Sequence, residues 1–233
     1  MIGLMQSRKV GMLNHEEHGG EVMKPLRPAF SFSPCSPRLA LCALILLLSA
    51  CGASAPTRYH TLLDTPSGAQ ASISAKFFID VLPVSIPAQV DRPQLVVRDG
   101  GGVLPLEQER WIAPLADEAR AALSADLSRE LGATDIAGQP RPVGARVLTI
   151  RVDLRRFESV PGAYAAVDAV WSLNTDGATS SPLVCTASAH ESTGQGYDEL
   201  VRAHRRALAN LAGRTASAAQ AYMSGRKDGC TSG

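Results

Sequence analysis

The sequence has no apolar run long enough to cross a membrane, no block of basic residues and no internal repeat. A transmembrane helix needs about 20 consecutive apolar residues, and the apolar run at 39–50 is shorter than that. The formal net charge of the 233 residues is only +1, and aromatic side chains do not interleave with basic ones. These absences argue against a membrane-spanning protein and against a nucleic-acid partner.

The motifs of common catalytic and metal sites are also missing. His60, His190 and His204 fall in different predicted elements, so no two of them have the spacing of metal ligands. Neither a Gly-x-Ser-x-Gly motif nor a Ser-x-x-Lys with its partner motifs occurs. The glycines at 100–102 lack the Gly-Lys-Ser/Thr of a phosphate-binding loop and predict a hairpin turn instead. We therefore predict a protein without catalytic residues, metal or cofactor.

Three carboxylates, Asp153, Glu158 and Asp168, fall on neighbouring predicted strands and could be read as a catalytic pair. Arginines at 151, 155 and 156 lie among them. Solvated ion pairs across the strands are the simpler interpretation.

One short apolar segment ends at a cysteine among small residues. Leu48-Ser49-Ala50-Cys51 has the form of a bacterial lipobox, in which the cysteine thiol is acylated and the chain is cut just ahead of it. A basic flank, Lys24, Arg27 and Arg38, precedes the apolar core, as in a signal peptide. We predict Cys51 as the lipidated first residue of the mature chain, with a buried cysteine at a helix end as the alternative.

The lipobox defines how the chain is organised. Because the basic region of a signal peptide is short, we interpret 1–22 as an over-extended start and 23–50 as the signal peptide. Residues 51–75, rich in Ala, Ser, Pro, Gly and Thr, form the lipidated N-terminus and a tether, in which TRYHTLL can be a first strand. One domain follows at 76–224, and 225–233 is a tail.

Two cysteines, Cys185 and Cys230, remain beyond the signal and the lipobox. The compartment of a lipoprotein permits disulfides, so the two can be bridged across about 45 residues. The alternative is a thiol buried in a strand at Cys185 and a separate thiol in the tail.

Hydrophobic periodicity predicts the elements of the domain. Alternating or continuous apolar runs predict strands in 76–87, 94–107, 145–160, 163–173 and 181–190. A four-residue apolar repeat between Pro114 and Gly132 predicts one long helix, with Glu118 on its polar face, and a second helix runs from about 197 to 222 with His204 on its apolar face. The expected fold is a single α/β domain bordering on α+β, with a mixed sheet covered by the two helices.

Several segments, in this order, resemble a known family: the lipobox, TRYHTLLD, VLPVSIPAQVDRPQLVVRDGG, QERWIAPLADEARAAL, RRFESVPGAYAAVDAVWSL and GYDELVRAHRRALANLA. This order closely resembles the ABC-type transport auxiliary lipoproteins, the PqiC-like family, over nearly all of 57–222. The resemblance implies a three-layer fold like the anticodon-binding-domain class. It also implies a periplasmic lipoprotein that works with an MCE-domain protein and an inner-membrane permease or ABC component in lipid traffic and outer-membrane integrity.

Asp91, Arg92, Arg110 and Trp111 lie in the segment richest in family-like residues that periodicity does not explain. We interpret them as a candidate partner interface. The structural alternative is that Arg92 pairs with Asp91 or a helix end while Trp111 fastens the helix to the sheet.

Two functions stay open at this stage. The chain can be a non-enzymatic subunit anchored in the outer membrane and facing the periplasm, with a homo-oligomer open. It can instead be a stand-alone envelope lipoprotein with a structural role or a hidden hydrolase site, which a nucleophile and a base meeting in one pocket would favour.

Overall fold

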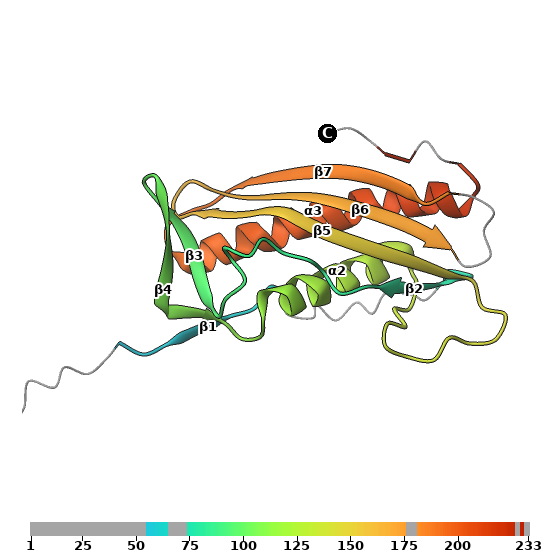
Figure 1. Ribbon diagram of the computed structural model, residues 1–233, viewed down its shortest axis with the longest axis horizontal. Helices are drawn as coiled ribbons and strands as arrows, with labels where there is room; N and C mark the ends of the chain where they lie inside the picture. The colour runs from blue at the N-terminus through green and yellow to red at the C-terminus, as the bar shows by residue number, and fades with distance from the viewer. Residues whose placement is uncertain (1–54, 65–73, 176–180, 227–228, 231–233) are drawn as a thin grey trace, which may run out of the picture. The chain divides into compact units, whose positions relative to one another are not determined.

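The computed structural model describes residues 55–64, 74–175, 181–226 and 229–230 (Figure 1). All of them belong to one unit of the chain, Ser54–Gly233. The predictions on 1–22, on the signal peptide at 23–50 and on Cys51 lie outside the described residues. Within these residues the elements follow the order β1 (Arg58–His60), β2 (Phe78–Val81), β3 (Gln94–Asp99), β4 (Gly102–Trp111), α2 (Leu115–Leu131), β5 (Val147–Val160), β6 (Tyr164–Thr175), β7 (Leu183–Ser192) and α3 (Tyr197–Met223).

The strands form two mixed sheets. One has the order β2-β5-β6-β7, with β2 parallel to β5 and the other pairs antiparallel. The second has the order β1-β4-β3, with β1 parallel to β4 and β3 antiparallel to β4. The α+β class is confirmed, and the structure differs from the expected single sheet in this division.

The division follows from where β2 leaves the edge of β5. After Phe78–Val81 the chain stays beside β5 as far as Ser85, which bridges to Asp153 and accepts a hydrogen bond from the Leu154 N–H at 2.9 Å. Pro87 and Pro93 follow Ser85, and because proline has no N–H to donate to a ladder, the pairing with β5 ends there. The β3–β4 hairpin packs against β5 instead, with Leu95, Val96 and Val97 all buried.

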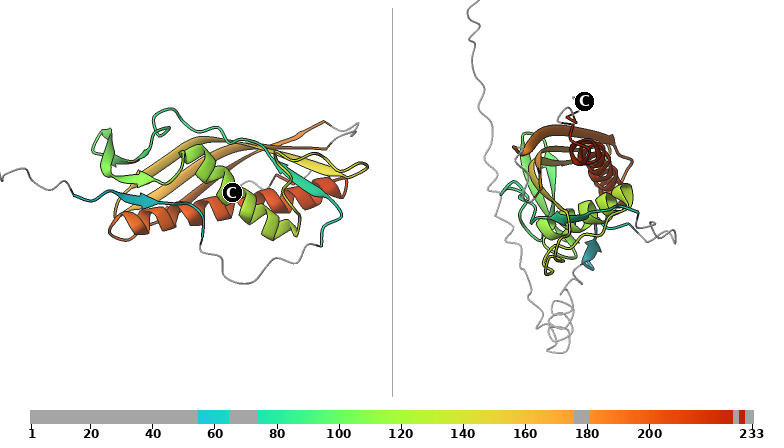
Figure 2. Two further views of the ribbon diagram at one scale, coloured as in Figure 1. Left: turned by 90° about the horizontal axis from the view of Figure 1, so that it is seen from below. Right: turned by 90° about the vertical axis from the view of Figure 1, so that its right-hand side faces the viewer.

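The long helices match the sequence patterns. Pro114 precedes α2, and Gly132 ends it in the left-handed conformation at φ 57°, which glycine adopts without steric cost. The apolar repeat Leu115, Ala119, Leu123, Leu127 and Leu131 is buried. In α3, His204 lies in the buried stripe as predicted. α3 packs on β6 and β7, α2 packs on α3 and β2, and both helices lie on the same face of the four-stranded sheet (Figure 2).

The core lies between this sheet and the helices. Alternate residues of β5 point into it (Leu148, Ile150, Val152 and Leu154), and so do those of β6 (Ala165, Val167, Ala169, Trp171 and Leu173). Each fully buried aliphatic side chain contributes roughly 1.5–3 kcal/mol relative to exposure. The predicted half-buried strands are confirmed.

One helical position was assigned to the wrong face. Glu118, predicted on the polar face of α2, is only 4% exposed. Its Oε2 accepts hydrogen bonds from the Thr61 hydroxyl at 2.7 Å and the Leu62 N–H at 2.8 Å. The chain after β1 packs against the first turns of α2, and it supplies the polar partners that a buried carboxylate needs.

Candidate functional site

A pocket of about 360 Å³ opens where the chain turns into β3 and where β4 connects to α2. We call it the corner pocket. Its lining residues are Asp91, Arg92, Pro93, Trp111, Ile112, Ala113 and Pro114. Two segments separated by about 20 residues in sequence thus form one concave surface beside the three-stranded sheet.

Local hydrogen bonds explain why these two segments meet. The turn before β3 is held by the N–H of Val90 donating to the Pro87 carbonyl at 3.0 Å. The N–H of Trp111 donates to the Pro93 carbonyl at 2.8 Å, which joins the turn to the end of β4. Pro114 then begins α2, because its fixed φ suits a helix start.

The pocket combines an apolar wall with two exposed charged side chains. Trp111 is 4% exposed and meets Phe157 edge-on at 6.2 Å between ring centroids, so it is both a core residue and a pocket wall. Ile112 is 61% exposed at the rim. In the described part of the chain, the exposed Asp91 and Arg92 side chains have no hydrogen bond or ion pair with another residue. Such a surface suits an amphipathic protein segment, whose apolar side chains need the wall and whose charges need Asp91 and Arg92.

The structure brings together three of the four predicted interface residues. Asp91, Arg92 and Trp111 line the corner pocket, whereas Arg110 lies outside its lining. Arg110 donates to the Glu107 carbonyl at 3.0 Å and lies 3.5 Å from the Glu107 carboxylate. Within the described residues Arg92 pairs with neither Asp91 nor a helix end, while Trp111 does fasten β4 into the core.

Sequence reasoning missed the network that fixes β1 beside this pocket. His60 Nε2 lies 2.5 Å from Glu109 Oε2 on β4, and both side chains are buried. Arg58 lies 2.7 Å from Asp198 at the start of α3. Arg205 of α3 donates to the Thr61 carbonyl at 3.0 and 2.6 Å. These partners are far apart in sequence, so no local pattern could have indicated them.

One buried serine–histidine pair tests the hydrolase alternative. Ser159 Oγ lies 2.8 Å from His204 Nε2, and His204 stacks on Phe157 at 3.9 Å between centroids. His204 Nδ1 has no partner among the described residues, and neither member of the pair lines the corner pocket. Burial lowers the pKa of His204 to about 3, which makes it a poor general base near neutral pH. The pair therefore lacks both an orienting group and access for a substrate.

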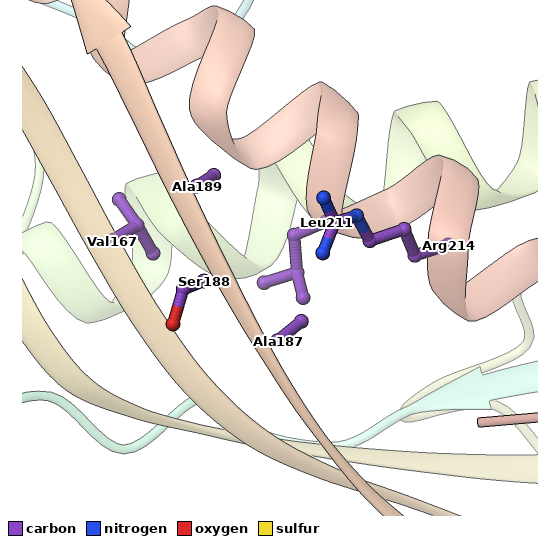
Figure 3. A pocket seen from close by; sticks show the side chains of 6 residues that line it. All are labelled: Val167, Ala187, Ser188, Ala189, Leu211 and Arg214. Carbon is purple, nitrogen blue, oxygen red and sulfur yellow. The ribbon is translucent and has the colours of Figure 1, made fainter. Parts of the chain in front are cut away.

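A smaller gap lies between α3 and the strands β6 and β7 (Figure 3). Arg214 and Leu211 of α3 face Ala187, Ser188 and Ala189 of β7, with Val167 of β6 behind them. The gap has no space for a water molecule. We interpret it as a packing gap beneath small strand residues and not as a ligand site.

The remaining predicted sites are the cysteines and the carboxylates. Cys51 lies outside the described residues, and the structure joins Cys185 on β7 to Cys230 by a disulfide with a Cα–Cα distance of 5.5 Å. Arg155 pairs with Asp153 at 2.7 Å, in an ion pair whose arginine is exposed and whose carboxylate is half-buried. Glu158 differs from the expected solvated pair, because its side chain is only 11% exposed and binds Arg98, Arg156 and Tyr164.

The chain belongs to the family of ABC-type transport auxiliary lipoprotein components, whose model matches residues 60–216. The matched region contains the corner pocket, the last residue of β1, all of the strands from β2 to β7, and most of α3. The family resemblance read from the sequence is thereby confirmed, and the chain is an auxiliary lipoprotein component of ABC-type transport.

Solved structures show the same fold at low sequence identity. An uncharacterised protein covers 70% of this chain and 97% of its own, with a TM-score of 0.55 and 20% identity. Protein XCC0632 from Xanthomonas campestris covers 74% of this chain and 98% of its own, with a TM-score of 0.50 and 17% identity. A search of curated proteins finds no match. Among the described residues, no helix is both long and apolar enough to span a bilayer.

Proposed function

We propose that this chain is a non-enzymatic, lipid-anchored subunit of an intermembrane lipid transport system that supports outer-membrane integrity. The anchor is a lipid on Cys51, in the outer membrane and facing the periplasm. The chain's partner is an MCE-domain periplasmic protein, itself linked to an inner-membrane permease or ABC component. Membership of the auxiliary lipoprotein family supports the transport role, and the lipobox supports the anchor.

The observation that carries the proposal is the corner pocket. It holds an apolar wall, an exposed isoleucine and two charges that are unpaired within the described part of the chain, all on one concave surface. Protein interfaces bury apolar and aromatic side chains at their centre and satisfy charges at their rim. We assign the partner to this pocket, with Trp111 and Ile112 as the apolar contacts and Arg92 as the rim cation.

Non-enzymatic action is supported by the closed serine–histidine pair. No observation favours the hydrolase alternative, since Ser159 and His204 are 3% and 0% exposed. A homo-oligomer is compatible with the proposal, because copies of the domain can surround one partner while each keeps its own pocket.

Replacing Arg92 by Glu tests the docking surface. The variant should lose most co-purification with the MCE-domain protein from detergent-solubilised envelopes, because reversing a rim charge destroys the charge complementarity of a docked surface. Its melting temperature should stay within a few degrees of wild type, since Arg92 is exposed and unpaired within the described residues. The matched control is Arg151→Glu on the exposed side of β5, which should co-purify normally.

Two outcomes would overturn parts of this proposal. If the wild type captures no MCE-domain protein, the functional assignment is wrong. If Arg92→Glu captures it as well as Arg151→Glu does, the partner binds elsewhere. Arg110→Glu is a second test, at the edge of the corner pocket. We expect a smaller loss of co-purification than for Arg92→Glu, because Arg110 is already paired with Glu107.

A further inference from the structure

The predicted lipid anchor lies only a few residues before the folded domain begins. Cys51 precedes Arg58, the first residue of β1, by seven residues. A fully extended chain spans at most about 3.3–3.6 Å per residue, so Arg58 stays within roughly 25 Å of a lipidated Cys51. The sequence had suggested a longer tether, because β1 was not known to be paired with β4.

The attachment of β1 to the domain is firm. Its partners come from β4, α2 and α3: Glu109 for His60, Glu118 for Thr61 and Leu62, and Arg205 for the Thr61 carbonyl. Because β1 cannot peel away without leaving the buried carboxylates of Glu109 and Glu118 unpaired, the anchor would hold one defined end of the domain close to the membrane. That end carries the three-stranded sheet (Figure 1).

Exposed apolar side chains gather at the same end. Tyr59, Leu63, Val103, Leu104 and Ile112 are 40–61% exposed, and each lies on or within three residues of β1 or β4. The other large apolar side chains exposed in the described part of the chain are Val143 and Val184. They lie in the loop before β5 and at the start of β7, at the opposite end of the domain (Figure 1).

The charges around this surface are balanced. Arg58, Arg98 and Arg110 are paired with Asp198, Glu158 and Glu107. The surface therefore has no excess of basic side chains of the kind that binds anionic lipids by charge alone. What it offers a bilayer is aromatic and aliphatic side chains, which settle at the boundary between headgroups and acyl chains.

We propose that the tip of the β3–β4 hairpin dips edge-on into the bilayer that holds the Cys51 lipid, so that Val103 and Leu104, which point to opposite faces of β4, both enter the headgroup region. This inference rests on the lipid anchor of the proposed function and adds the orientation of the domain to it. From Gly102 to Glu109, β4 spans about 23 Å at 3.3 Å per residue. The tip of the β3–β4 hairpin thus lies about 23 Å from β1, and the lipid on Cys51 reaches about 25 Å from β1. The hairpin tip and the lipid can therefore touch the same bilayer.

The contact does not need to be strong by itself. A lipid on Cys51 keeps the sheet at a high effective concentration near the membrane, so a few inserted side chains are enough to orient the domain. The corner pocket, at the other end of β4, is then held within about 30 Å of the bilayer, and a partner bound there stays near the membrane.

The test uses the full lipidated chain in vesicles of phosphatidylethanolamine and phosphatidylglycerol, without a transport partner. An environment-sensitive dye is attached to Val103→Cys, and in a second variant to Leu104→Cys. The control is the same dye on Val143→Cys, a fully exposed valine at the opposite end of the domain. The dye at 103 and 104 should show blue-shifted emission and quenching by nitroxide lipids, and the dye at 143 should show neither.

Every other outcome refutes either the membrane contact, the docking function or the lipid anchor. Equal quenching at 103, 104 and 143 in well-folded protein refutes the membrane contact. A shift at 103 that appears only when the MCE-domain protein is added makes the surface a protein interface and also refutes it. Normal capture of the partner without quenching refutes this inference alone, whereas quenching without capture refutes only the docking function. A chain that carries no lipid on Cys51 refutes both.

Discussion

Glu158 joins the two sheets through a single carboxylate. Arg98 of β3 and Arg156 of β5 both bind it, and the Tyr164 hydroxyl of β6 donates to it at 2.7 Å. Burial opposes ionisation and would raise the pKa of Glu158, but the hydrogen bonds from Arg156, Tyr164 and Arg98 outweigh it and lower the pKa from 4.5 to about 2. The β3–β4 hairpin is therefore held against the four-stranded sheet by a group that stays charged at neutral pH.

Replacing Glu158 by Gln should lower the free energy of unfolding at pH 7 by about 2 kcal/mol, because the amide keeps the shape and loses the charge-assisted hydrogen bonds. A lowered pKa in the folded state stabilises the protein above pH 4.5, and this contribution is lost as the pH falls from 4.5 toward about 2. The difference between wild type and variant should therefore disappear over that range in denaturant titrations.

Asp153→Asn is the matched control, because it replaces another carboxylate of β5 by its amide. The ion pair of Asp153 is more exposed than that of Glu158. It should change stability by no more than about 1 kcal/mol at any pH. A pH-independent loss in Glu158→Gln would mean that packing, and not charge, accounts for the effect.

At the scale of elements, the disulfide attaches the end of the chain to β7. Cys185 is buried opposite Trp171 of β6, whereas Cys230 is exposed. Gly229 lies so close to α3 that a Cβ there would be 3.0 Å from the Ala218 Cα atom. The last described residues are thus packed between α3 and β7, at the end of the domain opposite to β1.

Replacing Cys230 by Ser should lower the free energy of unfolding by about 4 kcal/mol, the chain-entropy value for a 45-residue separation. The wild type in reducing agent should show the same loss in denaturant titrations. Cys185→Ala should lose more, because it also removes a buried side chain.

The serine variant itself provides the control for the reductant, because its stability should not change when reducing agent is added. Two free thiols in the folded wild type under oxidising conditions would show that the bridge does not form.

At the scale of the whole molecule, the two ends of the domain carry different surfaces. The three-stranded sheet, the corner pocket and the attachment of β1 lie at one end, and β2, the loop before β5 and the disulfide lie at the other (Figure 1). A lipid on Cys51 would place the first end toward the membrane. The proposed partner site and the proposed membrane contact therefore lie at the same end of the domain, at the two ends of β4.

Replacing Cys51 by Ser should leave an unprocessed precursor without lipid, because the acylation reaction requires a thiol. Metabolic lipid labelling and the apparent mass of the chain measure this. Cys230→Ser, which removes a thiol outside the lipobox, should be labelled normally. Normal labelling of Cys51→Ser would refute the anchor.

Local patterns in the sequence were enough for most elements. The alternation in β5 and β6, the four-residue repeat in α2, and Pro114 and Gly132 at its ends each report on a face or a boundary within one segment. Such signals depend on neighbours two to four residues away, so they can be recognised in the sequence without knowledge of the fold. The lipobox is likewise a contiguous motif.

The sequence by itself thus determined the elements, their buried faces and the family of the chain. Only the tertiary structure decided that the strands divide between two sheets, that Glu118 is buried under Thr61 and Leu62, and that Asp91 and Arg92 meet Trp111 in one pocket. The physical reason is distance along the chain: Arg58 and Asp198, 140 residues apart, bind each other at 2.7 Å. A periodic pattern shows which side of a segment is covered, but the segment that covers it, and the charges it brings, are set by how all the elements pack together.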